Sequence, residues 1–170
     1  SANGEKIFER VGVRTSEVKD GIFLVNGKPV KLYGGNRHDF HPDKGAAVSY
    51  EDMRKDILLM KSLNVNALRT SHYPSSPLLY EMCDEQGLYV MSESDMESHG
   101  TVMMADGYDE SVFGALMDDP DFAHQIMERQ LCNIVVNKNH ACVVIWSLGN
   151  ESYMGKNFVK SALNIKSIDD

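Results

Sequence analysis

Apolar runs and amphipathic segments alternate along the chain from about residue 30 to residue 166. A short apolar run predicts a buried parallel strand, which is covered on both faces and therefore apolar at nearly every position. Apolar residues spaced three and four positions apart predict a helix. The pattern predicts strands at 30–35, 67–70, 88–91 and 143–147. It predicts helices at about 50–63, from 76 to Gly87, from 119 onward, and at about 156–166.

The helix ends carry the residues that favour them. Ser49 and Ser76 precede the first two helices, and serine is a preferred N-cap. Pro77 suits the first helical turn, and Gly87 suits the left-handed residue that ends a helix. The expected apolar face of the first helix is Met53, Ile57, Met60 and Leu63, and that of the third is Met127, Leu131, Ile134 and Val135.

Residues 1–29 follow a different pattern. Ile7-Phe8 and Val11–Val13 are short β-like pieces, and the turn pairs Asp20-Gly21 and Asn26-Gly27 enclose an apolar run. Such pairs are typical of hairpin turns. We therefore predict that residues 1–29 are the end of a preceding β-sandwich domain and a lead-in hairpin. Residues 30–170 are then a second, separate unit.

Four successive strand–helix units indicate an α/β fold with a parallel sheet and helices on its outside. No dinucleotide-binding glycine fingerprint follows the first strand, which disfavours a Rossmann domain. A (β/α)8 TIM barrel needs about 250 residues, more than residues 30–170 supply. The prediction is a partial TIM barrel, made of its first four β-α units and preceded by a short β segment.

Polar side chains gather after every predicted strand. In α/β barrels the catalytic groups come from the carboxyl ends of the strands, which share one rim. Groups that are distant in sequence should therefore converge there. The candidates are residues 36–42 after the first strand, Arg69, Ser71, His72 and Tyr73 after the second, Glu93, Asp95, Glu97 and His99 after the third, and Asn150 and Glu151 after the fourth.

Plainer interpretations of these residues remain open. His38 and His41 fit loop residues with local hydrogen bonds, and Arg69 fits a partner of a structural carboxylate. Carboxylates beside an imidazole suit a divalent cation, however, and Glu151 could reach the same ion as the loop after the third strand. One alternative hypothesis is thus a hydrolase that uses a metal on His38, His41, Glu97 and His99 directly.

Charge and cysteine content narrow the class of protein. The net charge is −8, and no cluster of Lys or Arg offsets it, so nucleic acid and anionic membrane are unexpected partners. No apolar run approaches the length of a membrane span. Three widely spaced cysteines, Cys83, Cys132 and Cys142, predict reduced core residues of a cytoplasmic protein. Neutral substrates fit this composition best.

Four stretches together resemble one enzyme family. They are residues 34–42 (GGNRHDFHP), 66–74 (NALRTSHYP), 93–100 (ESDMESHG) and 145–152 (IWSLGNES). In this order the chain resembles the catalytic barrel of glycoside hydrolase family 2, and within it the β-galactosidases. The β-glucuronidases of the family share residues 71–74, which keeps a β-glucuronidase-like enzyme as an alternative.

The resemblance implies hydrolysis of terminal β-D-galactosides such as lactose, with retention, by two carboxylic acids. Glu151 is then the general acid/base, and Asn150 holds the sugar 2-hydroxyl. His38 and His72 contact the galactosyl hydroxyls, and Arg69 orients the nucleophilic carboxylate.

The resemblance also implies a Mg²⁺ ion on Glu97, His99 and Glu151. It implies that the nucleophile lies on a later strand, outside these residues. The chain is therefore expected to be the truncated first half of a barrel, inactive alone. Its expected partners are a β-galactoside, the remainder of the barrel or another subunit, and further copies of itself. A non-catalytic half-barrel that assembles with a complementing partner is the second alternative.

Overall fold

The computed structural model describes residues 4–6, 8–103, 107–109 and 112–169. A three-stranded antiparallel sheet holds β1 (Ser16–Lys19), β2 (Ile22–Val25) and β3 (Lys28–Pro29). A four-stranded parallel sheet has the order β4 (Gly34–Arg37), β5 (Ala67–Thr70), β6 (Tyr89–Glu93) and β7 (Val143–Ser147). The main helices are α1 (Tyr50–Ser62), α2 (Pro77–Gln86), α4 (Ala123–Asn137) and α5 (Lys156–Lys166).

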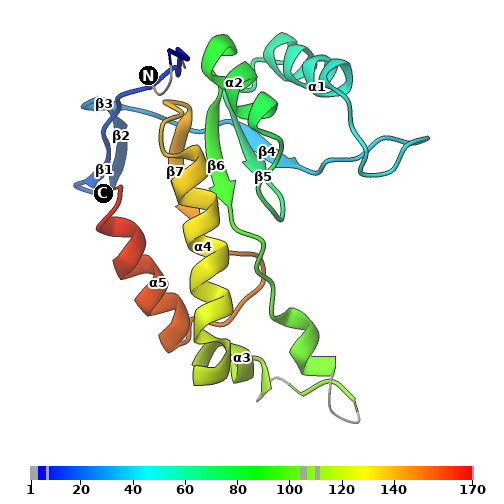
Figure 1. The fold of residues 1–170 in the computed structure, drawn as a ribbon, viewed down its shortest axis with the longest axis vertical. Coiled ribbons are helices and arrows are strands. Elements are labelled where there is room, and N and C mark those ends of the chain that lie inside the picture. The colour runs from blue at the N-terminus through cyan, green and yellow to red at the C-terminus, as the bar shows by residue number, and fades with distance from the viewer. Residues whose placement is uncertain (1–3, 7, 104–106, 110–111, 170) are drawn as a thin grey trace.

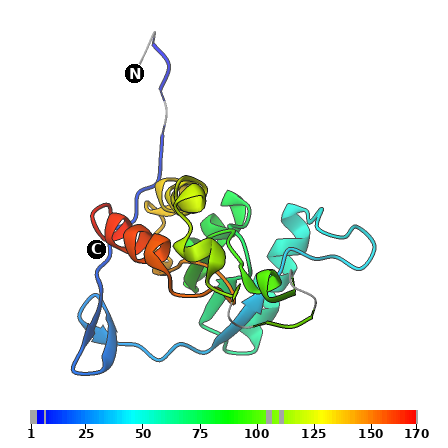
Figure 2. The same cartoon turned by 90° about the horizontal axis from the view of Figure 1, so that it is seen from below.

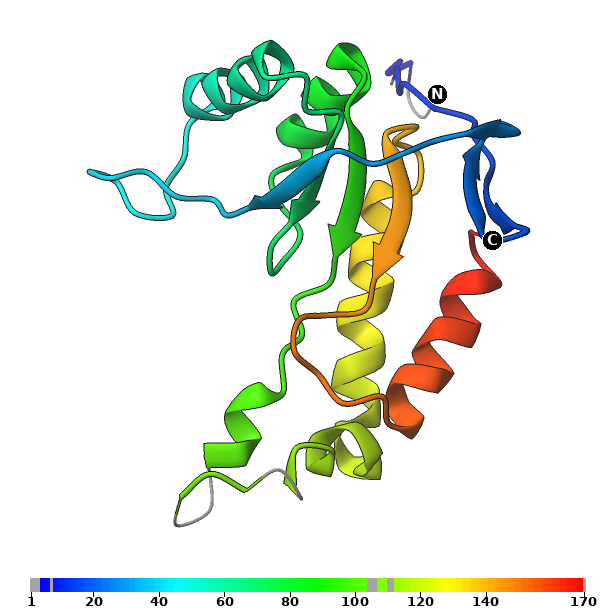
Figure 3. The ribbon, with the colours of Figure 1, turned by 180° about the vertical axis from the view of Figure 1, so that it is seen from behind.

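The parallel sheet carries its helices on one face (Figure 1). The main core lies between them: Met53 and Ile57 of α1 and Leu79 of α2 pack against Leu68 and Val90 of the sheet. Figure 3 views the sheet from the opposite face, which these helices leave uncovered. This is the arrangement of a barrel wall with its helical layer outside. The predicted α/β class and the partial barrel are confirmed.

The first parallel strand begins at Gly34, four residues later than predicted. The Asn66 side chain bonds the backbone of Lys31 and Tyr33, at 3.0 and 2.6 Å, and holds this stretch as an extended lead into the sheet. Gly34 then lies against Ala67 so closely that a β-carbon would collide with the Ala67 carbonyl oxygen. Tertiary contact therefore decides where the strand starts.

The predicted apolar face of α4 is partly wrong. Ile134 is buried, but Val135 is 59% exposed. The helix instead buries Gln130, Asn133 and Asn137 toward the sheet. Gln130 accepts a hydrogen bond from the Ser94 hydroxyl and donates one to the Leu148 carbonyl, so both ends of its amide are satisfied. Likewise Leu63 of the first predicted face is exposed.

The described residues between β6 and residue 119, where the pattern predicts no helix, include the short helices η1 (His99–Met103) and α3 (Ala115–Asp118). A further turn, η3 (Pro120–Phe122), precedes α4. Pro120 therefore starts this turn, and α4 begins at Ala123.

The hairpin around β1 and β2 is present, and Asp20 and Asn26 adopt the left-handed backbone that such turns require. Figure 2 shows its sheet set apart from the parallel sheet and joined to β4 by an extended segment. The expected β-like piece at 11–13 is not a strand. Instead, Gly12 donates its backbone N–H to the Asn139 carbonyl at 2.7 Å, just before β7. Residue 7 lies outside the described residues, and the boundary at residue 29 stays a prediction.

The cysteines divide into two kinds. Cys83 and Cys142 are buried as predicted, whereas Cys132 lies exposed on α4, which corrects that assignment. Burial raises the pKa of the Cys83 thiol to about 12. Among the described residues, no helix combines the length and the apolar content that crossing a membrane requires.

Candidate active site at the carboxyl ends of the parallel strands

Glu93, the last residue of β6, is fully buried and lies at the centre of the polar rim. Its carboxylate accepts hydrogen bonds from Arg69 Nε at 2.6 Å, His72 Nδ1 at 2.7 Å and the Ser147 hydroxyl. Its backbone N–H donates to the Thr70 hydroxyl at 3.0 Å. A buried carboxylate is tolerable only when it is paired and hydrogen-bonded in this way. Because Glu93 accepts from Nδ1, His72 keeps Nε2 available for another partner.

Arg69 joins the ends of four strands through one guanidinium. Besides Glu93, it donates to Asn150 Oδ1 at 3.1 Å, after β7, and to Asn36 Oδ1 at 3.4 Å, on β4. The plainer interpretation of Arg69, as the partner of a structural carboxylate, thus has an observed partner. The expected contact with a nucleophilic carboxylate stays a prediction.

Glu97, His99 and Glu151 form one cluster, with one ligand atom of each lying within 4.8 Å of the others. His99 Nδ1 lies 2.5 Å from Glu151 Oε2. Two carboxylates and an imidazole are a donor set that suits a hard or borderline divalent cation. All three residues are exposed, so an ion bound there would also carry water ligands.

Backbone contacts hold the loop after β6, which carries Glu97 and His99, against the loop after β7, which carries Glu151. The Asn150 N–H donates to the Met96 carbonyl at 2.9 Å, and Asn150 and Glu97 form a parallel bridge. Gly149 has φ of 156°, and a β-carbon there would collide with the Met96 carbonyl oxygen. Only glycine permits this approach, which carries Glu151 to the loop after β6.

The two histidines predicted to contact sugar lie together. The His38 and His72 rings meet edge to face with centroids 5.1 Å apart, and the Tyr73 ring lies 6.4 Å from His38. His38 is exposed, and His72 is partly buried. From Glu151 the connection to His72 runs through Asn150, Arg69 and Glu93. All seven predicted site residues therefore lie on one rim, while their individual roles remain predictions.

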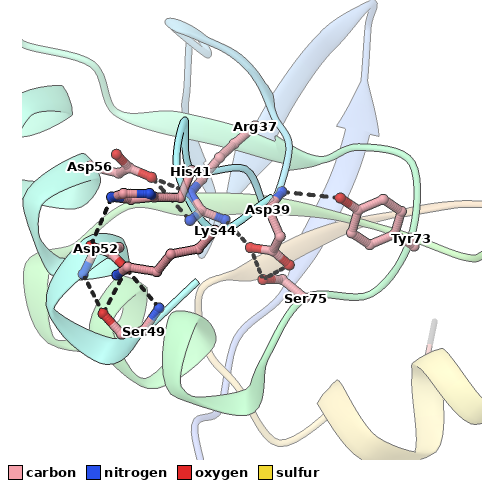
Figure 4. A network of polar contacts seen from close by, with 9 residues as sticks. All are labelled: Arg37, Asp39, His41, Lys44, Ser49, Asp52, Asp56, Tyr73 and Ser75. Atoms are coloured by element: carbon pink, nitrogen blue, oxygen red, sulfur yellow. Dashed lines mark hydrogen bonds and ion pairs between the residues drawn. The ribbon is translucent and has the colours of Figure 1, made fainter. Parts of the chain in front are cut away.

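Other candidates lie elsewhere. His41 Nε2 is 3.8 Å from Asp52 at the start of α1, and Asp95 pairs with Arg129 at 2.6 Å. Figure 4 shows the separate network to which His41 belongs. Within the described ranges, the groups that could hold an ion include neither His38 nor His41. The structure thus does not assemble the direct metal hydrolase from His38, His41, Glu97 and His99.

The same network fixes the loop after β4. The Arg37 guanidinium is buried and pairs with Asp39 at 2.6 Å and Asp56 at 3.0 Å. Asp39 also accepts from the Ser75 hydroxyl, at 2.9 Å, and its N–H donates to the Tyr73 hydroxyl. Hydrogen bonds from Lys44 and Ser49 lower the pKa of Asp52, which caps α1. These contacts hold the backbone on either side of His38.

The sequence pattern places Glu93 among the polar residues after the third predicted strand but indicates no role for it. The actual strand continues two residues beyond the predicted end at Met91, so Glu93 lies within it. A carboxylate inside a buried strand requires a cationic partner, and Arg69 supplies it. Ser147 and Asn36 were also given no role, and their residue types carry no distinguishing signal.

Known proteins match this chain along most of its length. A sequence profile described as glycosyl hydrolases family 2, TIM barrel domain, matches residues 16–170. The chain is 45% identical to a β-galactosidase of Staphylococcus xylosus over 166 residues, 98% of this chain and 17% of that protein. It is 48% identical to a β-galactosidase of Pseudoalteromonas haloplanktis over 147 residues, 86% of this chain and 13% of that protein.

The fold of this chain also resembles solved structures. The crystal structure of Ruminococcus gnavus β-glucuronidase superposes with a TM-score of 0.82 at 27% identity, covering 95% of this chain and 27% of that one. The chain thus spans less than a third of that enzyme and under a fifth of the β-galactosidases above. The match over residues 16–170, together with the parallel sheet and its polar rim, shows that this chain belongs to glycosyl hydrolases family 2, within the family's TIM barrel domain.

Proposed function

We propose that the protein containing this chain is a retaining β-galactosidase that hydrolyses terminal β-D-galactosides such as lactose. The observation that carries the proposal is the position of Glu151, beside Glu97 and His99 and next to the Asn150–Arg69 contact. Relatives named β-galactosidase are 40–48% identical to the chain, whereas the β-glucuronidase structures are 25–27% identical. This difference favours a galactoside over a glucuronide.

Each rim residue then has a chemical task. Glu151 protonates the glycosidic oxygen as the bond breaks and later takes a proton from the attacking water. Asn150, held by Arg69, presents its amide N–H groups to the sugar 2-hydroxyl. His72, oriented by Glu93, and His38 beside it bind other sugar hydroxyls. Arg69 keeps its charge near the position of the nucleophile.

Glu97, His99 and Glu151 would hold Mg²⁺, since carboxylate oxygens suit this ion and their ligand atoms already converge. The bound ion supplies fixed positive charge beside Glu151. We also infer a cytoplasmic protein from the three unpaired cysteines.

The test of substrate class uses the full-length protein that contains this chain. We expect hydrolysis of nitrophenyl β-D-galactoside, with the β-anomer of galactose released first, and little hydrolysis of the matching β-D-glucuronide. The two sugars differ at C4 and C6, so the preference reports the pocket directly. A glucuronide preference would establish the β-glucuronidase alternative, and inversion at the anomeric carbon would contradict the retaining mechanism with a carboxylate nucleophile.

The 170-residue chain alone is expected to show no turnover of the same galactoside. A retaining site needs a second carboxylate about 5–5.5 Å from the acid/base. Glu97 shares the cluster of Glu151, and Glu93 is buried beneath Arg69 and His72, so neither is placed as a nucleophile. Turnover by the purified chain that disappears in Glu151→Gln would contradict this expectation.

Magnesium is expected to bind the full-length protein through this cluster. Replacing His99 by Ala removes one of three protein ligands and should weaken Mg²⁺ binding at least about tenfold. Even the loss of a residue that only hydrogen-bonds to a metal ligand lowers metal affinity by about 10–100-fold. Isothermal titration after chelation measures the change. His124→Ala, on the surface of α4, is the matched control and should leave the affinity unaltered. Equal Mg²⁺ affinity in both variants would contradict the assignment of the ion to Glu97, His99 and Glu151.

The isolated chain is expected to associate with itself or with the remainder of the barrel. β4 and β7 are the outer strands of the parallel sheet, and unpaired strand edges favour pairing with another chain. The uncovered face carries a hollow of about 220 Å³ lined in part by Leu32, Leu68 and Met91. Light scattering should show an average mass that rises with concentration. A constant monomer mass at high concentration would contradict self-association.

A further inference from the structure

A second cluster of potential ligands lies at the opposite end of the sheet from the rim. Asp84 lies on α2, and His140 and Cys142 lie in the turn directly before β7. One ligand atom of each lies within 4.8 Å of the others. We propose that Asp84, His140 and Cys142 bind a thiophilic divalent cation of the zinc type. The proposal does not depend on the proposed glycosidase function.

Existing contacts already orient the three side chains toward one another. Asp84 Oδ2 lies 2.6 Å from His140 Nδ1, and Asp84 Oδ1 accepts the Cys142 backbone N–H at 2.8 Å. The Tyr80 ring packs against the His140 ring with centroids 5.5 Å apart. The side chains of His140 and Asp84 are only 17% and 15% exposed, and Cys142 is 5% exposed. The donors are therefore largely shielded and held in place before any ion binds.

Two hollows give an ion access to the cluster. One of about 310 Å³ is lined by Asp84 and His140 together with Glu9 and Glu81, and one of about 190 Å³ is lined by Asp84 and Cys142. Arg10 also lines the larger hollow, but its guanidinium pairs with Glu85 at 3.0 Å. The two glutamates add negative charge on the approach, which favours entry of a cation.

The donor types select the class of ion. A thiolate, an imidazole nitrogen and a carboxylate oxygen are the ligands that Zn²⁺ takes, and three of them leave a fourth position for water. Mg²⁺ and Ca²⁺ prefer oxygen ligands and would not use the sulfur. The cluster of Glu97, His99 and Glu151 offers no sulfur, so the two sites are chemically distinguishable.

Binding exchanges protons for the metal bonds. The Cys142 thiol, which donates to the Tyr80 carbonyl at 3.5 Å, loses its proton to solvent as the metal–sulfur bond forms. His140 moves its ring proton from Nδ1 to Nε2 and coordinates through Nδ1. Asp84 Oδ2, released from that hydrogen bond, coordinates as well. One proton is therefore released for each ion bound.

Cobalt titration of the 170-residue chain tests the proposal, because Co²⁺ occupies zinc sites and absorbs in the near ultraviolet when a thiolate binds it. We expect this thiolate band to saturate at one equivalent of Co²⁺ and to vanish when Zn²⁺ is added. The band should be lost in Cys142→Ser and should persist in Cys132→Ser, whose thiol is exposed and does not belong to the cluster. It should also persist in His99→Ala, which removes a ligand of the rim cluster.

A wild-type chain without the band, or a band that survives in Cys142→Ser, would overturn the proposal. Should Cys142→Ser fail to fold, X-ray absorption of the wild-type chain with one equivalent of Zn²⁺ decides. We expect one sulfur at about 2.3 Å and nitrogen or oxygen at about 2.0–2.2 Å. A shell of nitrogen and oxygen alone would overturn the assignment and leave Asp84 as a purely structural partner of His140.

Discussion

Replacing Glu151 by Gln in the full-length protein is expected to lower kcat/KM for lactose by about 10²–10⁴, the usual contribution of general acid–base catalysis. The amide is nearly isosteric but can neither give nor take the proton. Glu151 is exposed and bonded only to His99 among the contacts described above, so the change should leave folding intact. Steady-state hydrolysis measures the loss, and circular dichroism checks the fold.

The loss should depend on the leaving group. A dinitrophenolate departs without protonation, so its galactoside should lose far less in the first chemical step than lactose does. Asp95→Asn is a matched control, because Asp95 is an exposed carboxylate in the same loop as Glu97 but pairs with Arg129. An equal loss for both substrates, or a comparable loss in Asp95→Asn, would contradict the role of Glu151 as the acid.

Replacing Glu93 by Ala is expected to destabilise the 170-residue chain by about 3–5 kcal/mol, the usual effect of removing one partner from a buried ion pair. Arg69 would keep its charge without its strongest partner, and His72 and Ser147 would lose an acceptor. Because the Arg69 side chain is 24% exposed, water would relieve part of this cost, which favours the lower end of the range. Urea unfolding followed by circular dichroism measures the change.

A double-mutant cycle isolates the ion pair. Arg69→Met alone leaves the buried Glu93 carboxylate without its guanidinium partner. The double variant should therefore lose less stability than the sum of the losses in the two single variants. Glu97→Ala, an exposed carboxylate on the same rim, should change stability by no more than about 0.5 kcal/mol. Additive effects of Arg69 and Glu93 would show that the pair contributes little.

The fold class and most elements followed from the pattern alone. Helix α1 begins and ends within a residue of its predicted bounds, because Ser49 caps it with the reciprocal bond from Asp52. Helix α2 starts at Pro77 and is ended by Gly87 in the left-handed conformation, as these two residue types predicted. The strands at 67–70 and 143–147 match their apolar runs. These features depend on local chemistry and on burial, both of which a linear sequence records.

Candidate site residues were predictable as a set, because parallel strands bring their carboxyl ends to one edge. Their partners were not. The start of β4 is decided by the close approach of Gly34 to Ala67, and the position of Glu151 by the approach of Gly149 to Met96. The His41 side chain lies beside Asp52 and not with the other site candidates, because the loop after β4 is bound to α1.

The sequence by itself determined a parallel α/β sheet, its helices and the convergence of polar groups on one rim, since these depend on residue type and period. Only the tertiary structure decided that Glu93 is the buried centre on which Arg69 and His72 converge, and that Asp84, His140 and Cys142 meet at the other end. Such pairings join residues more than twenty positions apart. Their geometry depends on how the strands are aligned, which no local pattern encodes.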